Sequence, residues 1–215
     1  MNIHSFKGAI FDLDGTLFDS MGVWLDVDTA FFARRGMVLP TDYQDAIQSM
    51  RLDAIARYTK DTYHLPDSIE EIIAEWRALS LDAYKHHVPL KAGALALLKS
   101  LKANGIKIAY ATANDRLLSE VCLRANGIEA VFDAHAYLSE VNANKDEPTI
   151  YLLACERLGL TPDECIVFED VVTAAKGAQK GGFAVCGVYD KHSAEDAPTL
   201  KSVTDWFIHS FEELL

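Results

Sequence analysis

The chain has 215 residues, half of them apolar, and a formal net charge of −12 from 20 basic and 32 acidic residues. This length allows a sizeable buried core in one domain or one and a half. The acidic balance argues against nucleic acid or an anionic membrane as a partner, because binding a phosphate backbone needs a basic face. A small phosphorylated substrate stays compatible with it, since one site can be locally positive on an acidic surface.

No targeting or membrane segment is evident in the sequence. No apolar run reaches the roughly 18 residues of a spanning helix, and the first residues lack the apolar region of a signal peptide. The four cysteines are widely spaced without a CxxC pair, which is typical of reduced core residues. We therefore expect a cytoplasmic protein that is a monomer or a weak homodimer.

The first predicted element is a short strand that ends in two aspartates. The apolar run Gly8-Ala9-Ile10-Phe11 predicts a buried strand. Side chains two positions apart on an extended backbone point the same way, so Asp12 and Asp14 can face one small site, and Gly15 permits a sharp turn after them. Two close carboxylates repel each other, and Mg²⁺ is the simplest counter-charge. An ordinary Asp-Gly turn explains this stretch equally well by itself.

Residues 20–86 are predicted to be helical throughout. Apolar residues at helical spacing predict helices over 21–35, from 43 through 58 after a start at Thr41-Asp42, and over 69–86. No convincing strand interrupts them. We therefore expect an all-helical unit at 20–86, inserted into an α/β core domain that consists of residues 1–19 and 87–215.

From residue 88 onward helices and strands alternate. Helices are predicted over 94–103, 115–125, 147–158 and 171–180. Strands are predicted over 106–112, 165–168, 183–188 and 206–208, with short apolar pieces at 131–132 and 136–138 and a helical tail at 211–214. This alternation predicts an α/β fold with a parallel sheet and helices on both faces.

Polar residues follow several of these strands, and ligands of open parallel sheets bind beyond the carboxyl ends of the strands. The residues in question are Asp12 and Asp14, Thr112 and Asn114, Glu169 and Asp170, with Lys145 in a polar loop. Carboxylates that hold a metal, together with hydroxyl, amide and lysine groups that hold phosphate oxygens, indicate phosphoryl transfer. Singly, Thr112 could cap a helix, Lys145 could be a solvated loop lysine, and the acidic pair could be a helix N-terminus. Their joint placement favours a site.

The segments resemble the four motifs of the haloacid dehalogenase superfamily, a group of aspartyl-phosphate phosphatases and mutases. Asp12-Leu13-Asp14-Gly15-Thr16 is similar to the first motif, Thr112 to the second, Lys145 to the third and Glu169-Asp170 to the fourth. The segment 20–86 resembles the helical cap of subfamily I, in the branch of beta-phosphoglucomutase and phosphoglycolate phosphatase. The resemblance implies a Rossmann-like core with an inserted cap.

Some positions depart from the pattern of that branch. The third motif reads Lys145-Asp146-Glu147-Pro148 where Lys-Pro-x-Pro is usual, Ala113-Asn114 follows Thr112, and Val171 stands where serine is frequent. None of these differences removes a catalytic group. The acid at Asp14 favours phosphoester chemistry over dehalogenation, because dehalogenase members resemble a pattern without an acid there.

The resemblance also implies roles for individual residues. Asp12 would be the nucleophile and Asp14 the general acid and base. Mg²⁺ would be held by Asp12, Asp14 through its backbone carbonyl, and Asp170, with Glu169 as a ligand or a neighbour of the ligands. Thr112, Asn114 and Lys145 would hold the phosphate oxygens. Arg51 in the cap is a further candidate for contact with substrate, and an exposed helix arginine is its simpler interpretation.

The expected function is therefore a Mg²⁺-dependent phosphomonoester hydrolase that acts on a small phosphorylated metabolite through an aspartyl-phosphate. A phosphosugar mutase on the same machinery is the alternative, and it would need a cap that excludes water while the phosphoryl group passes to the sugar. A non-catalytic binding module is the third possibility. The presence of all the motif acids and of Lys145 argues against that module.

Overall fold

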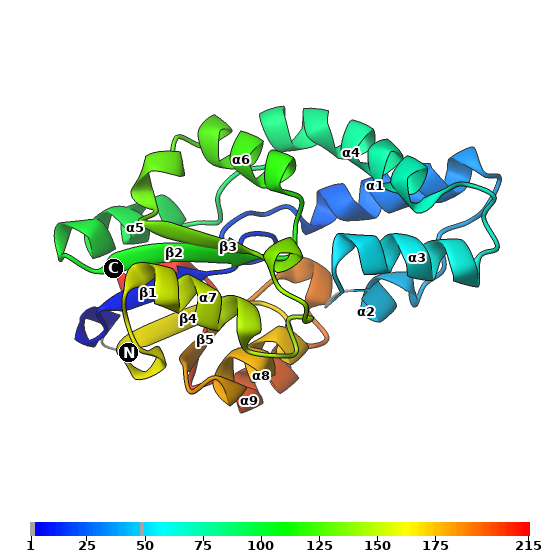
Figure 1. The fold of residues 1–215 in the computed structure, drawn as a ribbon. Helices are drawn as coiled ribbons and strands as arrows, with labels where there is room; N and C mark the ends of the chain where they lie inside the picture. Colours follow the sequence, from blue (N-terminus) through cyan, green and yellow to red (C-terminus); the bar gives the residue numbers. More distant parts are fainter. Residues whose placement is uncertain (1–2, 48–49) are drawn as a thin grey trace.

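The computed structural model describes residues 3–47 and 50–215, and its central element is a parallel β-sheet (Figure 1). The described strands have the order β3-β2-β1-β4-β5-β6. Their bounds are β1 (Gly8–Phe11), β2 (Lys107–Thr112), β3 (Ala134–Tyr137), β4 (Cys165–Glu169), β5 (Ala184–Val188) and β6 (Trp206–Ile208). Every neighbouring pair is parallel. The predicted α/β class and the Rossmann-like sheet are confirmed.

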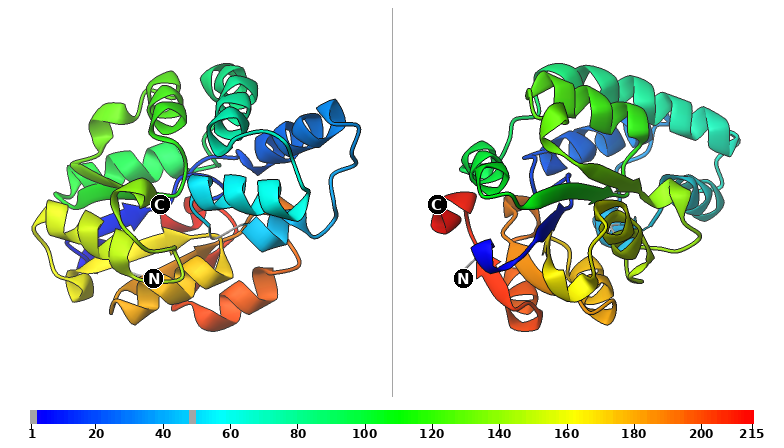
Figure 2. Two further views of the ribbon diagram at one scale, coloured as in Figure 1. Left: turned by 45° about the vertical axis from the view of Figure 1, so that its right-hand side comes forward. Right: turned by 60° about the vertical axis from the view of Figure 1, so that its left-hand side comes forward.

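Helices cover both faces of the sheet (Figure 2). One face carries α5 (Ala94–Ala103) and α6 (Arg116–Ala125), and the other carries α7 (Thr149–Leu158), α8 (Val172–Lys180) and α9 (Ala197–Val203). The pleat of β1 explains how both layers attach to it, because successive side chains point to opposite faces. Ala9 and Phe11 belong to the first hydrophobic cluster, and Ile10 to the second. The strand is therefore buried on both sides.

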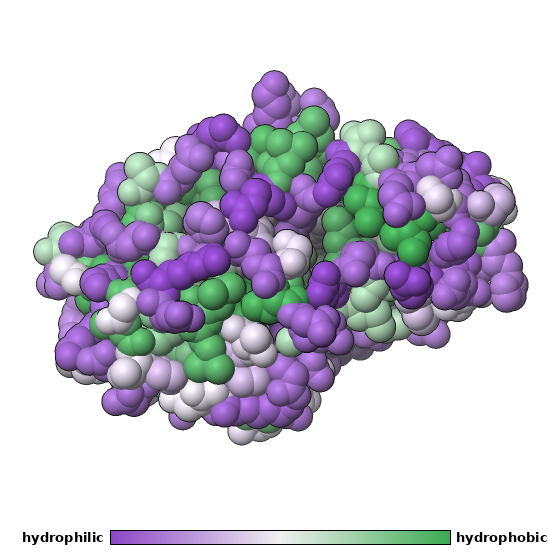
Figure 3. All heavy atoms as spheres, in the orientation of Figure 1, coloured by the Kyte–Doolittle hydropathy of each residue, from purple (hydrophilic) through white to green (hydrophobic). Residues whose placement is uncertain are grey.

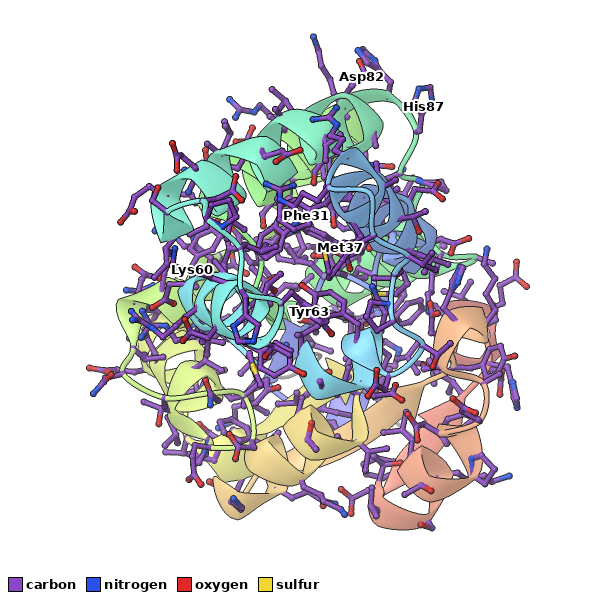
Figure 4. All side chains as sticks on the ribbon, turned by 90° about the vertical axis from the view of Figure 1, so that its right-hand side faces the viewer. Phe31, Met37, Lys60, Tyr63, Asp82 and His87 are labelled. Carbon is purple, nitrogen blue, oxygen red and sulfur yellow. The ribbon has the colours of Figure 1, made fainter. Side chains whose placement is uncertain are left out.

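A helical segment lies between β1 and α5, on the right of Figure 1. It consists of α1 (Met21–Arg34), α2 (Tyr43–Ile47), α3 (Leu52–Thr62) and α4 (Ile69–His86). Its hydrophobic cluster is separate from those of the sheet and includes Phe31, Phe32 and Trp76. In Figure 4, Phe31 lies between the helices while Asp82 and His87 lie on the outside. The predicted helical character is confirmed, and the exact division of the chain into domains stays a prediction.

The two connections between the helical segment and the sheet run side by side. The amide of Asp19 donates to the carbonyl of Pro89 at 3.0 Å, and the amide of Lys91 donates to the carbonyl of Leu17 at 2.8 Å. Phe18 and Leu90 form an antiparallel bridge between the same two stretches. The helical segment is thus attached through one paired strip of backbone.

No described helix is long and apolar enough to cross a membrane. Short 3-10 turns complete the chain. These turns are η1 (Ile3–Ser5), η2 (Glu129–Val131), η3 (Leu138–Glu140), η4 (Pro162–Glu164), η5 (Lys191–Ser193) and η6 (Phe211–Leu214). Each of them is only three or four residues long. They therefore serve as connections rather than as separate layers of the fold.

The structure differs from the expected elements at three places. The single helix expected over 43–58 is two helices, because Arg51 has an extended backbone (φ −72°, ψ 153°) and begins α3 as its N-cap; residues 48–49 of that expectation lie outside the described residues. Of the two apolar pieces, 131–132 precedes β3, with Val131 in a 3-10 turn, whereas 136–138 covers the last two residues of β3 and Leu138 of the next 3-10 turn. Helix α9, which has a proline in its first turn, was not predicted.

Candidate active site

The carboxyl ends of β1, β2 and β4 meet at one cavity of about 260 Å³. Strand β1 pairs with β2 on one side and β4 on the other, so the residues that follow these strands are brought to one edge. The sheet geometry continues into the site, because the amide of Asp12 donates to the carbonyl of Phe168 at 3.0 Å. The predicted site residues that line this cavity are Asp12, Asp14, Thr112, Asn114, Lys145, Glu169 and Asp170.

Lys145 is the positive centre of the site. Its Nζ donates to Oδ1 of Asp12 and to Oε1 of Glu169, and the same Glu169 oxygen accepts a hydrogen bond from the Tyr151 hydroxyl at 2.7 Å. Lys145 is only 4% exposed, so the simpler interpretation as a solvated loop lysine is wrong. Burial lowers the pKa of Lys145, but the carboxylates of Asp12 and Glu169 outweigh that effect and raise it. The lysine is therefore charged.

Gly15 and Thr16 place the carboxylate of Asp170. The Thr16 hydroxyl donates to Oδ1 of Asp170 at 2.7 Å, and both side chains are buried. Gly15 has a φ of +78°, which disfavours other residues, and a Cβ built on it would overlap Oδ2 of Asp170. The turn after β1 can therefore approach Asp170, directly after β4, only because residue 15 has no side chain.

The carboxylate of Asp14 is held by three donors from distant parts of the chain. Oδ1 accepts hydrogen bonds from the Ser20 hydroxyl at 2.6 Å and from the Tyr84 hydroxyl, and Oδ2 accepts one from Nδ2 of Asn114 at 2.8 Å. Ser20 precedes α1 and Tyr84 lies in the last turn of α4, so both connections to the helical segment reach this acid. Tyr84 was not predicted, because its helical spacing indicated only a core residue.

Thr112 and Asn114 lie at the end of β2. The Thr112 hydroxyl accepts a hydrogen bond from the amide of Asn114 at 3.1 Å, and a hydroxyl that accepts one bond keeps its proton for another. The N-cap of α6 is Asp115, which accepts from the amide of Leu117 at 2.9 Å. Thr112 does not cap this helix, and its buried side chain is instead part of the cavity wall.

Asp12, Glu169 and Asp170 form a buried carboxylate cluster. One oxygen of each lies within 4.8 Å of the others. Burial raises the pKa of Asp12 well above its usual range, and Glu169 and Asp170 add to this effect while Lys145 opposes it. Burial and the charge of Glu169 raise the pKa of Asp170 to about 7. The single positive charge of Lys145 does not neutralise the three acids, so a further cation would be favourable here. Carboxylate oxygens are the ligands that Mg²⁺ prefers. The cluster fits a divalent metal.

Arg51 is the one predicted site residue that does not line this cavity. Its Nη1 donates to the carbonyl of Val141 at 2.9 Å and its Nε donates to Oδ1 of Asp53 at 3.0 Å. The guanidinium therefore connects the start of α3 to the loop after η3. It lies at the boundary of the helical segment, and its contact with substrate stays a prediction.

The wall opposite the sheet edge comes from the helical segment and from the loop after β5. Figure 3 shows hydrophobic side chains on both sides of the hollow between the two parts of the molecule. The residues of the helical segment that line the cavity are Met21, Trp24, Leu25, Asp28, Gln44, Asp45, Ile47, Met50, Leu52, Ile55 and Trp76. Asp28 is 4% exposed, and its Oδ2 accepts a hydrogen bond from Nε2 of Gln44 at 2.5 Å. Sequence reasoning missed this wall, because no motif identifies it.

Comparison with known proteins agrees with this geometry. The family model described as haloacid dehalogenase-like hydrolase matches residues 6–182. Hexitol phosphatase A of Escherichia coli is 32% identical over 97% of this chain and 93% of its own length. A phosphorylated carbohydrates phosphatase of Thermotoga maritima is 25% identical over 90% and 89% of the two chains. The crystal structure of beta-phosphoglucomutase from Clostridium difficile has a TM-score of 0.80 and 20% identity, covering 98% and 93%.

Proposed function

The chain belongs to the haloacid dehalogenase-like hydrolase family, and from that premise we propose that it is a metal-dependent phosphatase that cleaves small phosphorylated metabolites. The observation that carries the proposal is the buried Asp12 carboxylate, hydrogen-bonded by Lys145 and lining the same cavity as Asp14. The names of the E. coli and T. maritima relatives support a sugar or polyol phosphate as the substrate.

Asp12 is the proposed nucleophile. Its carboxylate attacks phosphorus, the bond between phosphorus and the ester oxygen breaks, and an aspartyl-phosphate forms. Lys145 holds Oδ1 of Asp12, which orients the carboxylate before the attack. The charged lysine, the Thr112 hydroxyl and the Asn114 amide line the cavity where the transferred oxygens would lie.

Asp14 is the proposed general acid and base. In the first step, the protonated Asp14 gives its proton to the leaving oxygen of the ester. In the second step, the Asp14 carboxylate takes a proton from the water that attacks the aspartyl-phosphate. That water releases inorganic phosphate and restores the Asp12 carboxylate. The hydrogen bonds from Ser20, Tyr84 and Asn114 keep the Asp14 side chain in one orientation for both steps.

A divalent metal would be held by Asp12, Glu169 and Asp170. When bound, it neutralises charge on the phosphoryl oxygens and lowers the repulsion between them and the nucleophile. Thr16 fixes Asp170, and the hydroxyl of Tyr151 fixes Glu169, so the carboxylates are oriented before a metal arrives.

Residues 20–86 are the proposed cap on a core domain of residues 1–19 and 87–215. The side-by-side connections and the separate hydrophobic cluster support this division. Helices of this segment form the wall that faces the sheet edge, so their side chains would contact the leaving group. The mutase alternative finds less support, because the E. coli relative at 32% identity and the T. maritima relative at 25% are both named as phosphatases.

The test is phosphate release from a panel of phosphomonoesters that includes hexitol phosphates. The proposal expects release with Mg²⁺, none after chelation by EDTA, and none with Asp12→Asn at an unchanged circular dichroism spectrum. An enzyme that releases no phosphate from any member of the panel, or an Asp12→Asn variant as active as the wild type, would contradict it.

A further inference from the structure

We infer that the leaving-group side of this cavity accepts an uncharged polyhydroxylated group and discriminates against phosphate esters that carry a second anionic group. This inference rests on the proposed phosphatase function and makes its substrate class specific. It depends on the charges and hydrogen-bonding groups of the wall opposite the sheet edge.

The charged groups of that wall are almost all acidic. They are Asp28 and Asp45 of the helical segment and Asp190, Glu195 and Asp196 of the loop after β5. Among the described lining residues the basic side chains are Lys145 and His192 alone. Lys145 is already bound to Asp12 and Glu169 at the phosphate end. A second phosphate or carboxylate would meet acids instead of a cationic partner, and like charges in contact are strongly unfavourable.

Three described cations close to the wall, Lys91, Lys191 and Arg51, are bound to other groups. Lys91 pairs with Asp190 at 2.8 Å, and Lys191 pairs with Asp19 at 2.9 Å. Arg51, at the boundary of the helical segment, donates to the carbonyl of Val141. None of these three lines the cavity. The pairing neutralises Asp190 but leaves Asp28 without a cation, since its partner is the neutral amide of Gln44.

The remaining groups suit a chain of hydroxyls. The buried Asp28 and the half-buried Gln44 supply hydrogen-bonding oxygens and an amide. Trp24 and Trp76 supply flat apolar surfaces for carbon-bound hydrogens. The buried indole nitrogen of Trp76 has no hydrogen-bond partner among the described residues. A polyol, which both donates and accepts hydrogen bonds and carries no charge, matches this combination.

This charge pattern also separates the two enzymatic hypotheses. A mutase that moves a phosphoryl group between two hydroxyls of one sugar must hold a sugar bisphosphate at some stage. The second phosphate of that species would lie on the acidic wall. A phosphatase has no such requirement, because its product leaves as a neutral alcohol.

Two pairs of phosphate esters test the inference. The members of each pair have the same carbon chain, and the terminal carbon far from the phosphate is a neutral CH2OH in one member and an anionic carboxylate in the other. Sorbitol 6-phosphate and 6-phosphogluconate form one pair, and glycerol 3-phosphate and 3-phosphoglycerate form the other. We expect kcat/KM to favour the neutral member of each pair by at least about tenfold, and the ratio to fall as ionic strength rises. The assays are run at pH 8, where Asp28 is ionised although burial raises its pKa to about 7. Asp28→Asn and Asp196→Asn should each narrow the ratio, because each removes one negative charge from the wall and thereby raises kcat/KM for the anionic member.

Asp26→Asn is the matched control, because Asp26 lies on the same helix and is exposed without lining the cavity. It removes the same charge and should leave the ratio unchanged. Equal turnover within each pair, preference for the anionic member, or the same change from Asp26→Asn as from Asp28→Asn would overturn the inference while leaving the phosphatase standing. Absence of phosphate release from all four esters would instead refute the proposed function itself.

Discussion

At the scale of single residues, the site depends on how differently two aspartates are surrounded. Asp12 is buried against Lys145 and two other acids, whereas Asp14 accepts hydrogen bonds from Ser20, Tyr84 and Asn114 and has no described lysine or arginine partner. Lys145 opposes the effect of burial on the pKa of Asp12 and so favours the ionised carboxylate that a nucleophile needs. An acid-base group needs an orientation that survives proton gain and loss. The two environments match these separate tasks.

Tyr84→Phe tests the support of Asp14. The substitution removes one hydrogen bond to a carboxylate without changing the shape of the ring, so we expect kcat to fall about tenfold with little change in KM. Steady-state kinetics on a hexitol phosphate measures this. The control is Tyr110→Phe, which removes the buried 2.7 Å hydrogen bond between Tyr110 and Tyr137 inside the sheet domain. That control should lose about 1 kcal/mol of stability and keep its kcat; equal kcat losses in both variants would argue against a specific role for Tyr84.

Asp28 predicts a pH dependence of stability. Burial raises its pKa from 3.8 to about 7, so between these values the folded protein keeps a proton that the unfolded chain releases. Asp28 therefore contributes less to stability as pH rises through this window. The stability of Asp28→Asn relative to wild type should increase from pH 4 to 7, by up to about 1.4 kcal/mol per pH unit, and then level off. Urea unfolding across that range measures it, with Asp26→Asn as the control; a difference that does not change with pH would contradict the prediction.

At the scale of elements, the turn after β1 determines how close two strand ends can approach. Gly15→Ala should displace Asp170 from Thr16, because the new Cβ overlaps the carboxylate and the φ of +78° is unfavourable for alanine. We expect weaker metal activation and the loss of most activity, measured as the Mg²⁺ concentration for half-maximal rate. Gly36→Ala is the control, since Gly36 has a φ of +68° but open space around its Cβ position. It should lose about 1 kcal/mol of stability and no metal affinity. A Gly15→Ala enzyme with the Mg²⁺ response of Gly36→Ala would show that the close approach is unimportant.

The spacing of apolar residues predicted most of the elements. It failed where helical spacing in the sequence continues through a point at which the helix ends. The pattern from Tyr43 to Tyr58 stays helical in spacing, yet Arg51 is extended, and a periodic pattern contains no information about one extended residue. Helix α9 is only seven residues long and has too few apolar positions to show a period. Longer elements such as α4, whose start at Ser68 carries a capping box, were predicted close to their observed bounds.

At the scale of the whole molecule, the motif residues could be predicted and their partners could not. Strand order in a parallel sheet brings Asp12, Thr112 and Asp170 to one edge, so their proximity follows from alternating strands and helices. The hydroxyl of Tyr84 donates a hydrogen bond to Asp14, 70 positions away in the sequence. The guanidinium of Arg51 donates one to the carbonyl of Val141, 90 positions away. Those contacts depend on how the helical segment packs, which no local pattern describes.

Metal binding should stabilise the whole fold. A metal that binds the folded carboxylate cluster but not the unfolded chain raises stability by mass action, about 2.7 kcal/mol at a hundredfold excess over Kd. We therefore expect Mg²⁺ to raise Tm in a concentration-dependent way, measured by differential scanning fluorimetry. Asp170→Asn should lose most of this shift, and Asp163→Asn, an exposed acid before β4, should keep it. Equal shifts in both variants would place the metal elsewhere.

The most direct test of the proposed chemistry is to trap the phosphoryl group on the protein. Acid quenching of the wild type during turnover, borohydride reduction and peptide mass spectrometry should find homoserine at position 12. Asp14→Asn lacks the acid of the first step and the base of the second, so it should form and release the phosphoryl group more slowly at the same position. Asp12 is the residue that the geometry offers, because its carboxylate is buried in the cavity beside Lys145. Reduction product at position 12 that depends on substrate and Mg²⁺ is the predicted result. Steady phosphate release by the wild type, with no such product in either the wild type or Asp14→Asn, would contradict the account.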